Sequence, residues 1–132
     1  MLVPCEIAVK CLLPPVRAMI AKQLMTEHNL KQAEAAKLLG VSQSAVSLYY
    51  RKMRGKAIDL ENEAEAKKLI DNLAASLAKG DLSQKDFISM FCKICRIIRA
   101  EGRLCEMHKA IDPSIDAEKC GICLSITNPT CI

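Results

Sequence analysis

The sequence predicts an all-α fold with a core of roughly four to five helices. Hydrophobic residues make up 51% of the 132 residues but aromatic residues only 3%, so any core is built from aliphatic side chains and methionine. Only five glycines and five prolines interrupt the chain. Charged residues reach 26%, which excludes the disordered, collagen-like and membrane-embedded classes. These proportions favour one compact domain, or two very small ones that share a core.

The first long helix is expected from Pro14 to about His28. Pro14 and Pro15 end whatever precedes them and suit the first turn of a helix, where the missing backbone N–H has no helical partner in any case. Within this segment Ile20 and Leu24 recur at helical spacing, which predicts one buried face.

Two shorter helices are expected next. One fits residues 31–39 and ends at Gly40, because glycine tolerates the left-handed conformation that follows many helices. The other fits residues 43–52, and the hydroxyl of Ser42 can accept a hydrogen bond from a free backbone N–H at its start.

Two longer helices are expected in the second half. One runs from about residue 60 to 79 and ends at Gly80, and the next from about 83 to 101, where Ser83 and Asp86 resemble a capping box. The first of the two carries an apolar stripe made of Ala66, Leu69, Ile70, Leu73, Leu77 and Ala78.

After Gly102 we expect loops. Asp112 and Pro113 look like the cap and the first turn of one small helix in this region.

Charge is distributed unevenly along the chain. Residues 17–56 carry a net charge of +6, whereas residues 57–91 carry −3. The first segment therefore predicts an anion-binding surface, and the second a solvated acidic surface on which Glu63 and Lys67 form a favourable i,i+4 pair.

Residues 31–50, KQAEAAKLLGVSQSAVSLYY, carry the strongest pattern in the first half. Ala35 and Ala36 are the small residues that two touching helices need, Gly40 suits the tight turn, and Val41 and Val46 supply apolar contacts. The segment resembles the helix-turn-helix of the phage-repressor (XRE/Cro) class. An ordinary αα-hairpin shares the glycine and the alanines, but not the exposed polar residues described next.

Short polar side chains at the start of the second helix can bond base edges, and basic residues that can contact phosphates follow directly. Gln43 is the first choice for direct readout because glutamine can make a bidentate contact with adenine. The resemblance adds Gln32, which matches the glutamine that opens the first helix of the motif. The predicted DNA-binding residues are Gln32, Gln43, Ser44, Ser47, Arg51, Lys52, Arg54 and Lys56.

Six of the eight cysteines fall in the last 41 residues. In a chain without an export signal, pairs at two-residue gaps indicate metal binding, because residues i and i+3 share one face of a helix or knuckle. Packed apolar cysteines are the simplest alternative. Four thiolates suit either a zinc ion or an iron–sulfur cluster. The candidate metal ligands are Cys92, Cys95, Cys105, Cys120 and Cys123.

Most of the chain resembles a family of archaeal predicted regulators that join an XRE-type helix-turn-helix to a C-terminal cysteine-rich region. The matching stretches are Leu2–Glu6, Leu13–Ala18, Phe91–Arg96, Gly102–His108 and Cys120–Cys123. The resemblance implies DNA binding and an iron–sulfur cluster, [4Fe-4S] in preference to [2Fe-2S], with zinc as the alternative. Cys5 matches a family position and is a possible further ligand, whereas Cys131 matches none that we can place.

The sequence thus predicts a sequence-specific transcriptional regulator of double-stranded DNA, and not an enzyme, whose cluster senses redox state, oxygen or iron. The alternatives are a zinc-stabilised regulator without a sensing role and a small iron–sulfur electron-transfer or interaction protein. Residues 1–57 form the N-terminal segment and DNA-binding domain, 58–91 the connecting and dimerisation helices, and 92–132 a small metal-held tail.

We further expect a cytoplasmic homodimer, because no apolar run reaches the ~18 residues of a membrane span and two recognition helices usually read one site. The apolar stripe of residues 66–77 or the N-terminal segment is the expected seam, although that stripe also suits a core.

Overall fold

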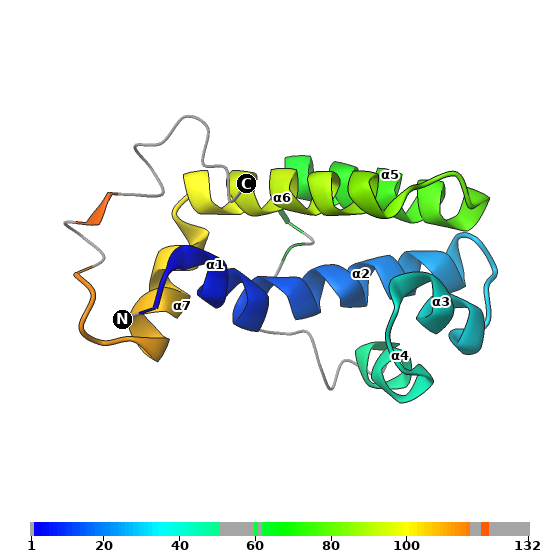
Figure 1. Ribbon diagram of the computed structural model, residues 1–132, viewed down its shortest axis with the longest axis horizontal. Helices are drawn as coiled ribbons and strands as arrows, with labels where there is room; N and C mark the ends of the chain where they lie inside the picture. Colours follow the sequence, from blue (N-terminus) through cyan, green and yellow to red (C-terminus); the bar gives the residue numbers. More distant parts are fainter. Residues whose placement is uncertain (1, 51–59, 61, 117–119, 122–132) are drawn as a thin grey trace.

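The computed structural model describes residues 2–50, 60, 62–116 and 120–121 of the chain (Figure 1). All regular structure in these residues is helical, so the predicted all-α fold is confirmed. The elements are α1 (Pro4–Ile7), the π-helical segment η1 (Ala8–Leu12), α2 (Leu13–Thr26), α3 (Gln32–Leu39), α4 (Gln43–Tyr50), α5 (Ala64–Lys79), α6 (Gln84–Ala100) and α7 (Arg103–Ile111).

The N-terminal segment is one continuous helical stretch from Pro4 to Thr26, so the prediction that Pro14 and Pro15 end the preceding structure was wrong. A proline inside a helix removes one backbone hydrogen bond and crowds the carbonyl four residues earlier. The wider π-helical turn of η1 lies directly before the two prolines, where those bonds are lost. The helix therefore passes through the prolines instead of starting at them.

Helices α5 and α6 lie side by side, and α5 also packs along α2 (Figure 1). The apolar stripe of α5 faces these neighbours: Ala66, Ile70, Leu73, Ala74 and Leu77 are all buried within one chain. The stripe is therefore core and is not free to serve as a dimer seam. Helix α6 begins as predicted, with the Ser83 hydroxyl accepting a hydrogen bond from the Asp86 N–H at 3.1 Å.

Helix α7 occupies a segment where loops were expected. Leu104 and His108, one turn apart, are buried against the rest of the protein, and the Nε2 atom of His108 lies 2.8 Å from the carbonyl oxygen of Leu2. The spacing of Leu104, Met107 and Ile111 is the helical signal that sequence reasoning passed over.

The small helix predicted at Asp112 and Pro113 is a turn instead. Asp112 follows the end of α7, and its carboxylate accepts hydrogen bonds from both the backbone N–H and the hydroxyl of Ser114. Its other oxygen accepts from the Leu2 N–H at 3.1 Å, which fastens the N-terminal segment to the end of α7.

The helices place two regions at opposite ends of the molecule (Figure 1). Helices α3 and α4 pack on each other and on α2 at one end. Helix α7 packs on α1 and α6 at the other. The stretch from α1 to α2 runs between these ends, with α5 and α6 alongside. No helix in the described ranges is both long enough and apolar enough to cross a membrane.

Candidate nucleic-acid interface

The turn between α3 and α4 is set by Gly40. This glycine has φ +67° and ψ +32°, the left-handed conformation, as predicted. Its N–H donates to the Lys37 carbonyl, and the N–H of Val41 donates to the Ala36 carbonyl at 3.0 Å. This pair of bonds satisfies carbonyls at the end of α3 and turns the chain sharply toward α4.

Helix α4 starts where the sequence predicts. The Ser42 hydroxyl accepts a hydrogen bond from the Ala45 N–H at 3.1 Å, which confirms its capping role. Ala35, Ala36 and Val46 are buried where the two helices meet, so small residues allow close approach and one apolar residue anchors α4. The packing of these residues leaves the opposite face of α4 outward.

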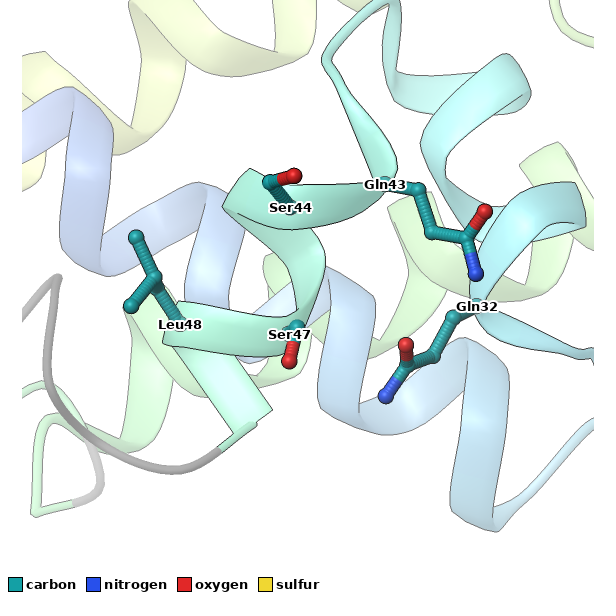
Figure 2. A pocket seen from close by; sticks show the side chains of 5 residues that line it. All are labelled: Gln32, Gln43, Ser44, Ser47 and Leu48. Atoms are coloured by element: carbon teal, nitrogen blue, oxygen red, sulfur yellow. The ribbon is translucent and has the colours of Figure 1, made fainter.

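That outward face carries the predicted base-reading residues. Gln32 from α3 and four residues of α4 (Gln43, Ser44, Ser47 and Leu48) line one open hollow of about 390 Å³. Figure 2 shows the two glutamine side chains together at one end of the hollow and Leu48 at the other. Gln43 and Ser44 are exposed and Ser47 is half-buried, so their polar atoms are accessible to a ligand.

Sequence reasoning missed Leu48 as a member of this surface. The burial pattern of α4 explains its position: Ala45, Val46 and Tyr49 face the core, and Leu48 lies on the other side of the helix. The sequence could have predicted this position, because Leu48 follows Ser44 by four residues and therefore lies on the same face of the helix.

The predicted phosphate contacts Arg51, Lys52, Arg54 and Lys56 lie outside the described residues. Other basic side chains are exposed on the same part of the chain, on α2, on α3 and between them, namely Lys22, Lys31 and Lys37.

The cysteines are spread over several helices. Cys92 and Cys95 lie one turn apart on α6, where Cys95 is buried, and Cys105 lies on α7, which packs against α6. Cys120 is half-buried, while Cys123 and Cys131 lie outside the described residues. Within the described ranges, no three His, Cys, Asp or Glu side chains form a group that could hold a metal ion. In this arrangement at most two of the described thiolates therefore come together, so a four-thiolate site needs at least two further ligands that are not gathered there.

The two N-terminal cysteines differ in their surroundings. Cys5 is half-buried on α1, the helix that packs on α7. Cys11 is buried, and burial raises the pKa of its thiol, with the charge of Lys10 acting in the opposite direction. Cys11 therefore stays a neutral thiol at physiological pH and serves as a packed apolar residue.

Two helices joined by a glycine turn, with a polar outward face on the second, define a helix-turn-helix unit of the kind found in DNA-binding regulators. Residues 22–60 match the family model described as "Helix-turn-helix", which supports the XRE-type assignment and DNA binding. No curated protein and no solved structure matches the chain.

Proposed function

We propose that this protein is a transcriptional regulator that binds a specific sequence of double-stranded DNA through α4. One observation carries the proposal: polar side chains of α3 and α4 share a single outward-facing hollow at the N-terminal end of α4. The recognition helix of a helix-turn-helix places its N-terminal residues against base edges in the major groove. The family match over residues 22–60 supports the same reading.

Each polar residue of the hollow has a matching role. Gln43 is the first residue of α4. Its side-chain amide can donate a hydrogen bond to N7 of adenine and accept one from the N6 amino group of the same base. Ser44 and Ser47 can bond either a base edge or a phosphate. Gln32 lies beside Gln43 and is suited to orient its amide (Figure 2). Arg51, Lys52, Arg54 and Lys56 would supply phosphate contacts, which carry most of the sequence-independent affinity.

The protein is further proposed to act as a homodimer, because one recognition helix covers only a few base pairs. Since the α5 stripe is core, the seam must lie elsewhere. The first half of α6 is the proposed place, because Ile88 lies on its exposed side. Phe87, Met90 and Phe91 of the same helix are partly buried and pack against the core. Ile88 is 46% exposed. A second copy of the same face would cover the Ile88 side chain.

The cysteine-rich region is proposed to hold an iron–sulfur cluster, [4Fe-4S] in preference to zinc. Its ligands would come from Cys92, Cys95, Cys105, Cys120 and Cys123. The i,i+3 spacing of Cys92 and Cys95 on α6 supports two ligands to one centre. The other thiolates would have to move toward these two when a cluster binds, because no three candidate ligands gather in the described residues. Arg99, 6% exposed and one turn after Cys95, would offset the negative charge of the thiolates. When bound, such a cluster supplies reversible one-electron chemistry, which would let the protein sense redox state, oxygen or iron.

Salt-dependent binding to duplex DNA tests the proposal directly. Fluorescence anisotropy with duplexes selected from a random library should give a specific dissociation constant well below that for random duplex. The logarithm of the affinity should fall linearly with the logarithm of salt concentration. A purely electron-carrying or interaction module would show neither behaviour.

A further inference from the structure

Leu48 is the one apolar side chain among the five residues that line the hollow. It is half-buried, yet it belongs neither to the core nor to the partly buried apolar side chains that pack against the core in the described ranges. Its neighbours Ala45, Val46 and Tyr49 already supply the packing of α4. A leucine on the outward face of a recognition helix is therefore available to a ligand.

The polar side chains of the hollow indicate which part of a ligand Leu48 can contact. Gln43, Ser44 and Ser47 are hydrogen-bonding groups suited to base edges, and Leu48 follows Ser44 by one helical turn on the same surface. In the major groove, the apolar feature presented by a base is the C5-methyl group of thymine. An isobutyl side chain beside hydrogen-bonding groups matches that methyl group and nothing else on the base edges.

We propose that Leu48 reads a thymine methyl group and so specifies an A·T pair in each half-site. The proposal rests on the proposed function, because it requires α4 in the major groove. Leu48 lies five residues after Gln43, which corresponds to about 7.5 Å along a helix axis. Successive base pairs are about 3.4 Å apart. The thymine therefore lies about two base pairs from the base that Gln43 contacts.

The test removes one methyl group at a time. Each thymine of the library-selected duplex is replaced singly by deoxyuridine, which keeps its pairing, and binding is measured by anisotropy at one fixed salt concentration. Loss of one buried methyl group should weaken wild-type binding about fourfold at one thymine per half-site. For Leu48→Ala the same replacement should change affinity less than twofold. Leu38→Ala, the matched control on α3, should keep the fourfold sensitivity, because Leu38 is also exposed but does not line the hollow.

A second arm restores the methyl group on another base. With cytosine at that position, 5-methylcytosine should bind the wild-type protein more tightly than unmodified cytosine does, and Leu48→Ala should not distinguish them. Alanine is the best helix former, so Leu48→Ala should fold, and circular dichroism checks this. Equal deoxyuridine sensitivity in wild type and Leu48→Ala would overturn the proposal while specific binding stands. Failure to select any specific duplex would overturn the proposed function as well.

Discussion

The Nη1 atom of Arg103 lies 2.5 Å from the Oε1 atom of Glu63, forty residues earlier in the chain. Glu63 immediately precedes α5, whereas the predicted partner of Glu63, Lys67, bonds Asp71 at 3.1 Å. His108 and Asp112 of the same C-terminal segment hold Leu2. The segments that enter and leave the helix-turn-helix are thus both fastened to α7 and the turn that follows it.

Gly40→Ala should destabilise the protein by about 1–2 kcal/mol, since a side chain at positive φ is strained. The cost is conformational, because a Cβ atom at this position would meet no other atom within 4 Å. Gly40→Asn should cost less, as asparagine tolerates this conformation. Chemical denaturation of the three proteins gives the comparison. Equal stability of Gly40→Ala and wild type would contradict the geometry described for this turn.

Glu101→Gln should raise the melting temperature at pH 7 but leave it unchanged near pH 4. A hydrogen bond with Glu63, followed by burial and the charges of Glu63 and Glu65, raises the pKa of Glu101 above its ordinary value, against the opposing effect of Arg103. Because the pKa of Glu101 is raised on folding, the protonated side chain stabilises the folded protein. This contribution to the free energy of unfolding is complete below the pKa of Glu101 in the unfolded chain, and it is lost as pH rises through the pKa in the folded protein. Glutamine keeps the donor at both pH values. A larger increase in melting temperature at pH 4 than at pH 7 would contradict the raised pKa of Glu101.

Gln43→Ala should reduce discrimination at one or two base pairs by about 1–3 kcal/mol. Arg54→Ala should instead weaken binding to all sequences and flatten the salt dependence. Titrations of both variants against selected and random duplexes at several salt concentrations separate the two effects. If the variants behave alike on both duplexes, the assignment of α4 as the recognition helix is wrong.

Ile88→Glu should raise the dimer dissociation constant at least about tenfold, or about 1.4 kcal/mol. It would place a charge on a face that we propose a second copy covers. Ile111→Glu is the matched control, since Ile111 is 39% exposed on α7, outside both proposed interfaces. Sedimentation equilibrium at micromolar concentration reads out the change. A monomeric wild-type protein, or equal effects of both substitutions, would exclude this seam.

Anaerobically purified protein should contain iron and acid-labile sulfide, and Cys95→Ser should lose most of both. Cys11→Ala should keep them, because Cys11 is also buried but packs as an apolar residue. Elemental and sulfide analysis of the three proteins decides the matter. Stoichiometric zinc without sulfide would establish the zinc alternative instead.

Local signals in the sequence predicted local structure well. Gly40, Ser42 and Ser83 act on atoms a few residues away, and each does in the structure what its type and position suggested. The same holds for Gln32 and Gln43, which the motif brought to one surface.

Long-range contacts account for what the sequence did not reveal. The helical spacing of α7 was present in the sequence, but its contacts with Glu63 and Leu2 are not identified by any local pattern. The stripe on α5 was visible, but periodicity alone does not say whether its partner is α2 or another molecule. Proline usually ends a helix, but here the π-helical segment before Pro14 lets the helix continue through it.

The unbroken helical backbone from Pro4 to Thr26 also restricts how this sequence can change in length. One inserted or deleted residue turns an α-helix by about 100° and shifts it by about 1.5 Å. Leu2 is bonded to the α7 end, and the buried Leu24 lies on α2, which packs on α3 and α4. A single-residue insertion between them would therefore rotate α3 and α4 about the long axis relative to α7.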